Sequence, residues 1–329
     1  MNEDHSGRKG VRENGKHPFG ALKVREALRD GSFVPYYETG CGAAFQGNSL
    51  DLLPRLPDGS INLILTSPPF ALTRKKEYGN KSAAEYVDWF LQFAPEFHRV
   101  LSEDGSLVID LGGAYLPGYP VRTIYQFEVL IRLCREYDFH LAQEFYHYNP
   151  SRLPAPAEWV NIRRIRVKDS VNVVWWLSKS EFPKANNRNV LKPYSKSMEQ
   201  LLRDGYKAKM RPSGHNISEN FNKRNKGAIP PNLLEIANTE SNSEYLRRCK
   251  EEGIKPHPAR FPSAFAEFFI KFLTDEGDTV LDPFAGSNTT GATAEELHRA
   301  WVAFELEEDY LEGSKFRFTE ELSLFPLRR

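Results

Sequence analysis

The sequence has few cysteines and no long apolar run. Its three cysteines, Cys41, Cys134 and Cys249, are too far apart along the chain to suggest a disulfide framework or a metal cluster, so we expect free thiols and no metal. No stretch is long and apolar enough to predict a membrane-spanning helix. The polar start of the chain predicts no secretory signal. These absences favour a folded, cytoplasmic protein.

The chain also lacks net charge, since 44 Lys and Arg residues balance 44 Asp and Glu residues. The balance is uneven along the chain: residues 151–230 hold 17 basic and 6 acidic side chains. A neutral protein with one strongly basic segment can bind a polyanion through that segment, and a solvated basic surface is the alternative. Charge alone therefore leaves nucleic-acid binding open.

The hydrophobic pattern predicts alternating strands and helices. Short apolar runs predict buried strands at residues 61–65, 106–110, 171–177, 279–282 and 301–305. Apolar residues spaced three and four apart, or a turn followed by such a pattern, predict helices at 81–101, 121–137, 262–273 and 288–299. Apolar strands that alternate with helices predict an α/β fold with a doubly wound, mostly parallel sheet.

This alternation is interrupted by a segment rich in Asn, Lys, Arg, Ser, Gly and Pro. We therefore predict a loosely ordered start at residues 1–32 and one half of the α/β domain at 33–182. A basic, loop-rich appendage follows at 183–250, and the second half of the domain occupies 251–329.

A strand-to-helix turn follows the predicted strand at 279–282, at the place where open α/β sheets bind ligands. Gly286 in this turn lets the backbone approach a ligand, and the helix N-terminus offers N–H groups to an anion such as a carboxylate. The turn has neither the Walker pattern nor the full dinucleotide pattern. Glu305, at the end of the next strand, can hold the two hydroxyls of a ribose. A tight turn and a solvated strand end are the plainer alternatives.

A second motif, Ser67-Pro68-Pro69-Phe70, follows the predicted strand at 61–65. Each proline fixes φ and lacks an N–H, so the carbonyls of Ser67 and Pro68 and the Ser67 hydroxyl form a row of acceptors. Phe70 offers a flat face to an aromatic base. Acceptors around an aromatic amine favour its pyramidal form, which can attack a methyl group in line. Asp110, at the end of a neighbouring strand, either assists this chemistry or caps a turn.

Together, Thr66–Phe70 and Asp282–Thr290 resemble the catalytic and cofactor motifs of the S-adenosylmethionine-dependent amino-methyltransferases of type II restriction–modification systems. The catalytic motif comes first and a basic region lies between the two, which is similar to the β-group order. Further segments resemble the PvuII-type N4-cytosine enzymes in particular: Ser67–Asn80, Asp110–Tyr115, Arg166–Asn172, Arg211–His215 and Ile229–Leu234. The resemblance covers most of residues 40–320.

This resemblance implies a seven-stranded, Rossmann-like methyltransferase sheet. It implies transfer of a methyl group from S-adenosyl-L-methionine to N4 of a cytosine flipped out of a short palindromic site in double-stranded DNA, with CAGCTG as the candidate site and S-adenosyl-L-homocysteine as the product. It also implies protection against a restriction endonuclease without a stable complex, by a monomer or weak dimer. Adenine-N6 methylation and a noncatalytic DNA-binding relative stay as alternatives, although Ser67 favours cytosine because adenine enzymes more often carry Asp there.

The resemblance also assigns residues. It implies that Ser67 and Asp110 act together at the target amine and that Glu305 binds the ribose. Asn48, where the family usually has Asp, lies in the turn that contacts the adenine ring. The methionine end is expected to be held by His257, Ala259 and Phe261 and by the cofactor turn, of which we single out Asp282, Phe284, Gly286, Ser287, Asn288 and Thr289. Asn288 stands where the commonest pattern has a second glycine.

Basic side chains are expected to contact the DNA. Phosphate contacts are predicted for the cluster Arg163, Arg164, Arg166 and Lys168. Arg211 and His215 in the appendage are candidates for base readout, because an arginine can bridge O6 and N7 of guanine. Ordinary loop polarity is the alternative for these two.

Overall fold

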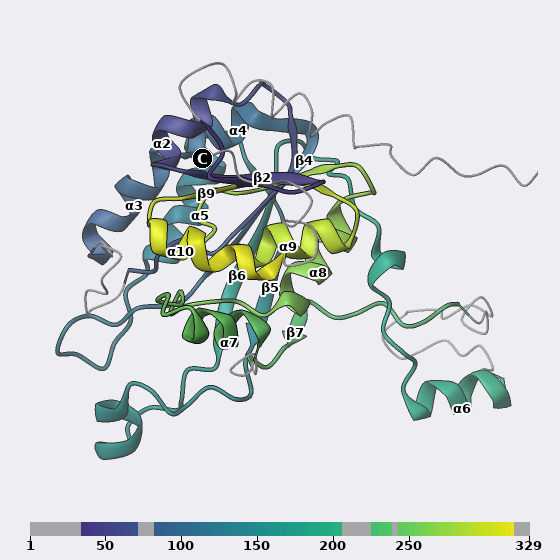
Figure 1. The fold of residues 1–329 in the computed structure, drawn as a ribbon. Coiled ribbons are helices and arrows are strands. Elements are labelled where there is room, and N and C mark those ends of the chain that lie inside the picture. The colour runs from purple at the N-terminus through teal and green to yellow at the C-terminus, as the bar shows by residue number, and fades with distance from the viewer. Residues whose placement is uncertain (1–33, 72–81, 206–224, 239–242, 319–329) are drawn as a thin grey trace, which may run out of the picture.

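The computed structural model describes residues 34–71, 82–205, 225–238 and 243–318 (Figure 1). Arg211 and His215 lie outside the described residues. Within the described residues the strands form one nine-stranded sheet in the order β1-β2-β9-β8-β3-β4-β6-β5-β7. The five strands from β2 to β4 run parallel, β6 runs antiparallel between β4 and β5, and β1 is antiparallel to β2.

Seven longer strands make up the body of the sheet. They are β2 (Gly42–Gln46), β3 (Ile61–Thr66), β4 (Leu101–Leu111), β5 (His140–Tyr148), β6 (Val171–Ser178), β8 (Thr279–Asp282) and β9 (Ala300–Glu305). Two short edge strands, β1 (Tyr37–Glu38) and β7 (Leu233–Glu235), extend it. The predicted α/β, mostly parallel sheet is confirmed. The two additional strands have two and three residues, too few to show a strand pattern in the sequence.

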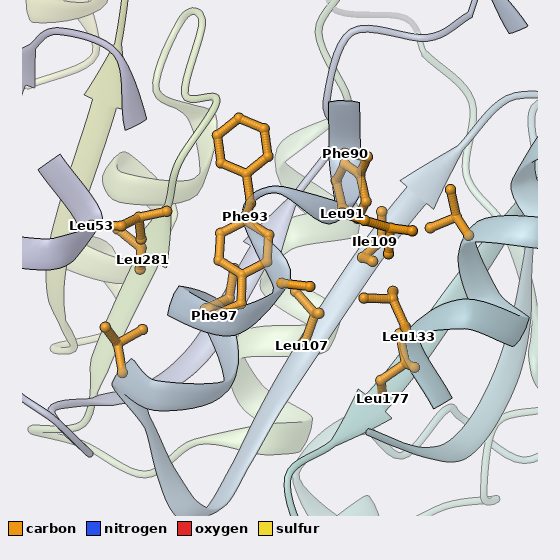
Figure 2. Packing of buried hydrophobic residues seen from close by; sticks show 14 of the residues in the cluster. Leu53, Phe90, Leu91, Phe93, Phe97, Leu107, Ile109, Leu133, Leu177 and Leu281 are labelled. Atoms are coloured by element: carbon orange, nitrogen blue, oxygen red, sulfur yellow. The ribbon is translucent and has the colours of Figure 1, made fainter. Parts of the chain in front are cut away.

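Helices cover both faces of the sheet (Figure 1). One face carries α2 (Ser49–Leu52), α3 (Ala83–Leu91), α4 (Ala94–Val100) and α5 (Tyr125–Glu136), and the other carries α8 (Ser263–Leu273), α9 (Thr289–Glu296) and α10 (Glu308–Ser314). Successive strand residues alternate between two buried apolar clusters, with Leu107 and Ile109 in one and Val108 in the other. Figure 2 shows Phe93 and Phe97 near Leu107, and Phe90 near Ile109, in the first cluster.

Two predicted elements differ in detail. The single helix predicted at 81–101 is two helices, α3 and α4, because Pro95 lies in the first turn of α4 and cannot donate a backbone hydrogen bond to a continuous helix. The strand predicted at 106–110 is longer, because β4 begins at Leu101 and includes Asp104 and Gly105. The pairing of β3 with β4 shifts register there, since Ile61 opposes Leu101 whereas Leu63 opposes Ser106.

The described part of the basic appendage contains one short 3₁₀ turn (Asn187–Val190), α6 (Lys196–Asp204), β7 and α7 (Glu244–Glu251). β7 pairs in parallel with β5, so this region contributes a strand to the main sheet. In Figure 1, α6 lies well away from the sheet and has no buried residue. The division at residues 183 and 250 stays a prediction.

The connection between β5 and β6, residues 149–170, also stands out from the sheet (Figure 1). It contains one turn of π-helix, Glu158–Ile162. Its ends are next to each other because Tyr148 of β5 pairs with Val171 of β6. Among the described residues, no helix is long and apolar enough to span a membrane.

Candidate active site

A cavity of about 630 Å³ lies at the carboxyl ends of the parallel strands. Its wall brings the predicted catalytic motif and the predicted cofactor motif together, although more than 200 residues separate them in the chain. Thirteen of the predicted site residues line it: Asn48, Ser67, Pro68, Pro69, Phe70, Asp110, His257, Ala259, Phe261, Phe284, Ser287, Thr289 and Glu305. Asp282, Gly286 and Asn288 are not part of this wall.

The two motifs meet because β3 and β8 are neighbours in the sheet, with Ile64 opposite Leu281. The last residues of the two strands, Thr66 of β3 and Asp282 of β8, are hydrogen-bonded to each other. The Thr66 hydroxyl donates a hydrogen bond of 2.8 Å to Asp282 Oδ1. Parallel neighbouring strands end at the same edge, so the loops that follow them face one cavity.

Asp282 organises the cofactor turn from beneath. Its buried carboxylate accepts hydrogen bonds from Thr66, from Thr290 Oγ1 at 2.7 Å and from the Phe284 N–H at 3.1 Å. Burial raises the pKa of this carboxyl to about 6, and the hydrogen bonds oppose that rise. Its place behind the cavity wall makes Asp282 a support of the turn.

Gly286 and Asn288 both adopt left-handed backbone conformations, with φ of +53° and +52°. A Cβ on Gly286 would lie 3.0 Å from ring atoms of His257, so the close approach of the ring requires glycine. Asn288 accepts from the Gly291 N–H at 3.0 Å and donates to the Tyr37 hydroxyl at 2.9 Å. Asparagine tolerates the left-handed region better than most residues, which explains how it replaces the glycine of the common pattern.

Glu305 is fixed at the end of β9 by backbone donors. Its Oε2 accepts from the Gly286 N–H at 2.7 Å, and its Oε1 accepts from the N–H groups of Leu306 and Glu307, both at 2.9 Å. Burial raises the pKa of this carboxyl above its ordinary value, and the three N–H donors oppose the rise. A carboxylate offers about four acceptor positions, so capacity remains for a ligand hydroxyl.

The turn after β2 forms another part of the wall. Asn48 caps α2 through its amide oxygen, which accepts from the Leu50 N–H at 3.1 Å. The neighbouring Ser49 hydroxyl donates to the Pro283 carbonyl at 2.5 Å, which fastens this turn to the cofactor turn. Asn48 therefore has a structural role at the place where the sequence predicts an adenine contact.

The catalytic loop is braced against the end of β4. Ser67 Oγ donates to the backbone carbonyl of Asp110 at 3.4 Å, so its partner is the main chain and not the carboxylate. The Tyr125 hydroxyl donates to the Gly112 carbonyl and accepts from the Ala71 N–H, which links the two loops. The Phe70 ring lies so close to Gly112 that a Cβ there would come within 2.5 Å of the ring.

Polar residues that the sequence did not single out surround the Asp110 side chain. Asn172 Nδ2 donates to Asp110 Oδ2 at 3.4 Å, and His147 Nδ1 lies 3.9 Å from the same oxygen. Arg152 Nη1 donates to Asn172 Oδ1 at 3.0 Å. All four side chains line the cavity. Asn172 lies in a segment that resembled the N4-cytosine enzymes, but neither its role nor that of His147 could be inferred from spacing.

Most of the basic cluster predicted to contact phosphate has partners within the chain. Arg166 donates to the Pro120 carbonyl at 2.7 Å and lies over the Tyr115 ring, while Lys168 Nζ donates to the carbonyls of Pro150 and Arg152. These contacts shape the 149–170 connection.

The tip of the same connection carries the other two members of the cluster. There, Arg163 pairs with Glu158 at 2.7 Å, and Arg164 is exposed. Both guanidinium groups are therefore at the surface, and the phosphate contacts of the cluster stay a prediction.

A doubly wound sheet, a turn built for a nucleoside-like ligand and a Ser-Pro-Pro-Phe loop at one cavity define a methyltransferase of the amino-directed class. The chain belongs to the DNA methylase family of N6 and N4 methyltransferases, whose model matches residues 61–316.

Individual relatives are close. The type II methyltransferase M.PvuII of Proteus hauseri is 55% identical over 289 residues, which cover 87% of this chain and 86% of M.PvuII. The solved PvuII DNA methyltransferase, described as cytosine-N4-specific, superposes with a TM-score of 0.72 and 50% identity over 88% of this chain and 89% of that structure. A Thermus thermophilus protein, TTHA0409, solved in complex with S-adenosyl-L-methionine, shares the fold at 20% identity and a TM-score of 0.53, covering 85% of this chain and 94% of that one.

Proposed function

We propose that this protein transfers a methyl group from S-adenosyl-L-methionine to the exocyclic N4 of a cytosine flipped out of a short palindromic site in duplex DNA. The observation that carries the proposal is the cavity that Ser67–Phe70 lines together with Phe284, Ser287, Thr289 and Glu305. The similarity to M.PvuII and to the N4-specific PvuII structure supports cytosine N4 as the target and CAGCTG as the first site to test.

The chain's residues fit the proposed cofactor. Glu305, oriented by three N–H donors, keeps acceptor capacity for a ribose hydroxyl. Asn48 and the His257–Phe261 segment line the same cavity for the adenine and methionine ends. Gly286 leaves the backbone without a side chain at the turn, which lets the His257 ring of the cavity wall pack closely against it. When bound, the cofactor supplies an electrophilic methyl group.

The catalytic loop suits a planar aromatic amine. The carbonyls of Ser67 and Pro68 precede prolines, which lack N–H groups, so they are stiffly held acceptors. Acceptors around the amine favour its pyramidal, nucleophilic form. Phe70, held against Gly112, presents a ring at the cavity wall on which a flipped base can stack.

Duplex DNA is the proposed partner, and the 149–170 connection is its proposed contact. Arg152 of this connection lines the cavity and exposed Arg163 and Arg164 lie at its tip, so a backbone laid across the cavity mouth would meet guanidinium groups. Arg166 and Lys168 would then act in part by shaping the connection. Arg211 and His215 are retained as proposed base-reading residues. We further propose a cytoplasmic monomer or weak dimer that protects DNA from a restriction endonuclease without binding it stably.

The direct test is transfer of a labelled methyl group from S-adenosyl-L-methionine to duplex DNA with and without CAGCTG, followed by nucleoside mass spectrometry. We expect N4-methylcytosine only in the DNA that carries the site. N6-methyladenine would replace the cytosine assignment, and cofactor binding without any transfer would favour a noncatalytic relative.

Ser67→Ala is the matched test of the catalytic loop. We expect turnover to fall while calorimetric binding of the cofactor is retained, because Ser67 follows β3 and Glu305 ends β9, with β8 between these two strands. Ser102→Ala removes a serine hydroxyl at the opposite end of β4, where its partner is exposed Asp104, and serves as the control substitution. If Ser67→Ala kept the wild-type turnover, Ser67 would not be a catalytic residue.

A further inference from the structure

Asp110 and His147 are two buried titratable groups whose side chains face each other beside the catalytic loop. Their exposed fractions are 3% and 7%. They come from β4 and β5, which are separated in the sheet by β6, and Asn172 of β6 lies directly opposite His147 in the strand pairing. Asp110 Oδ1 and His147 Nδ1 are both buried without a hydrogen-bond partner in the described structure. An unpaired buried polar atom is costly, so one on each of two neighbouring side chains calls for a physical reason.

The surroundings of His147 assign its ring hydrogen. His147 Nε2 lies 3.2 Å from the backbone carbonyl of Ile236, which can only accept, so Nε2 must carry the hydrogen. In the neutral ring, Nδ1 then presents a lone pair to Asp110 Oδ2 at 3.9 Å. Two acceptors that face each other in a buried site repel, and one proton between them would convert the contact into a hydrogen bond.

Such a pair suits a reaction that releases a proton. We propose that Asp110 takes the proton lost by the target amine and that His147 receives it from Asp110. The proposal rests on the proposed amino-methyltransferase function. When the amine nitrogen forms its bond to the methyl group, the methyl–sulfur bond of the sulfonium donor breaks and its electron pair stays on sulfur. One N–H bond must also break: its electron pair stays on nitrogen and its proton goes to Asp110 Oδ2. Asp110 Oδ2 then gives this proton to His147 Nδ1, and the product leaves as a neutral N-methylated base.

Neighbouring groups hold the pair in place. Asn172 fixes Asp110 Oδ2 by donating to it and is itself held by Arg152. The His147 ring lies at 5.0 Å from the Phe265 ring of α8, centroid to centroid, which limits its rotation. The other charged side chains that line the cavity are Arg152, Arg260, Glu305 and Glu307. His147 is thus a positioning residue, since it acts on the amine only through Asp110.

Two variants separate a titratable His147 from a structural one. His147→Gln can keep a donor toward the Ile236 carbonyl, and His147→Asn can place a donor toward Asp110, but neither can take up a proton. We expect both to lower kcat roughly 100-fold, the lower end for loss of general acid–base help, with unchanged KM for DNA and cofactor. The acidic limb of the kcat–pH profile should change shape in both. His140→Gln, an exposed position on the same strand, is the control and should leave kcat unchanged.

The proposal would be overturned if either folded variant had the wild-type kcat and pH profile. It would also be overturned if the variants raised KM and left kcat unchanged. Nitrogen-15 spectra of the histidine rings in the intact protein provide a readout that does not depend on activity. Asp110→Asn should change the Nδ1 signal of His147 and leave that of His140 unchanged; an unchanged His147 signal would overturn the pairing. If the wild-type protein methylates no DNA while the spectra show the pair, the proposed function fails and the pairing stands.

Discussion

Replacement of Gly286 by alanine tests whether the cofactor turn needs both its backbone conformation and its empty side-chain position. At φ +53°, an alanine costs about 1–2 kcal/mol of folding free energy relative to glycine. The new Cβ would also lie 3.0 Å from His257 Cε1 and Nδ1, closer than ordinary van der Waals contact, so the ring, which packs at 4.5 Å from the Tyr310 ring between centroids, must shift. The substitution therefore combines backbone strain with displacement of a cavity-wall residue.

Gly59 supplies the matched control. Its φ of +62° is similar, and a Cβ there would meet no atom within 4 Å. Gly59→Ala should thus lose about 1–2 kcal/mol of stability from backbone strain alone and bind the cofactor normally. Gly286→Ala should lose more stability and should bind S-adenosyl-L-methionine roughly tenfold more weakly, which corresponds to about 1.4 kcal/mol.

Urea denaturation followed by circular dichroism measures the stability of each variant, and calorimetry measures the dissociation constant of the cofactor. The reasoning is refuted if folded Gly286→Ala binds the cofactor with wild-type affinity. It is also refuted if the two alanine variants lose the same stability, because the contact with His257 would then contribute nothing.

Three further predictions concern polar side chains at or beside the cavity. Because the pKa of Asp282 is raised to about 6, its contribution to stability is present below about pH 4 and lost as the pH rises through 6. Urea denaturation should therefore show the unfolding free energy of Asp282→Asn increasing by about 3 kcal/mol relative to that of the wild type between pH 4 and 7.5. A difference that stays constant with pH would contradict this. Tyr125→Phe should cost about 1–3 kcal/mol by leaving the Gly112 carbonyl without its donor, and kcat should fall with cofactor affinity retained, whereas wild-type stability and kcat would argue against the brace. Asn48→Asp should keep the helix cap and tighten calorimetric cofactor binding several-fold, since a carboxylate is the stronger acceptor for an adenine amino group; weaker binding would oppose an adenine contact there.

The two motifs could be predicted because their chemistry is local. Prolines after Ser67 and a glycine in a strand-to-helix turn specify backbone geometry within a few residues, and apolar runs specify the strands before them. The sequence shows Asn288 where the commonest pattern has glycine but does not show why either residue is needed. The φ of +52° supplies the reason, because glycine and asparagine both tolerate the left-handed region.

Contacts across the sheet could not be predicted in this way. His147 and Asn172 lie beside Asp110 only because β6 is inserted antiparallel between β4 and β5, in one particular register. A shift of one residue would send both side chains to the other face. Likewise, Arg166 and Lys168 looked like surface charges until the path of the 149–170 connection placed carbonyls beside them.

The central position of β8 has a consequence for how the protein is made. β3 has β8 as its neighbour on one side, yet the ribosome completes β3 more than 200 residues before it reaches Thr279. Until then, one long edge of the nascent sheet lacks its hydrogen-bond partner and its covering helices, and is open to mispairing. A chain that stops before β8 cannot methylate DNA, because the cavity is completed by residues after β8 and by Glu305 at the end of β9.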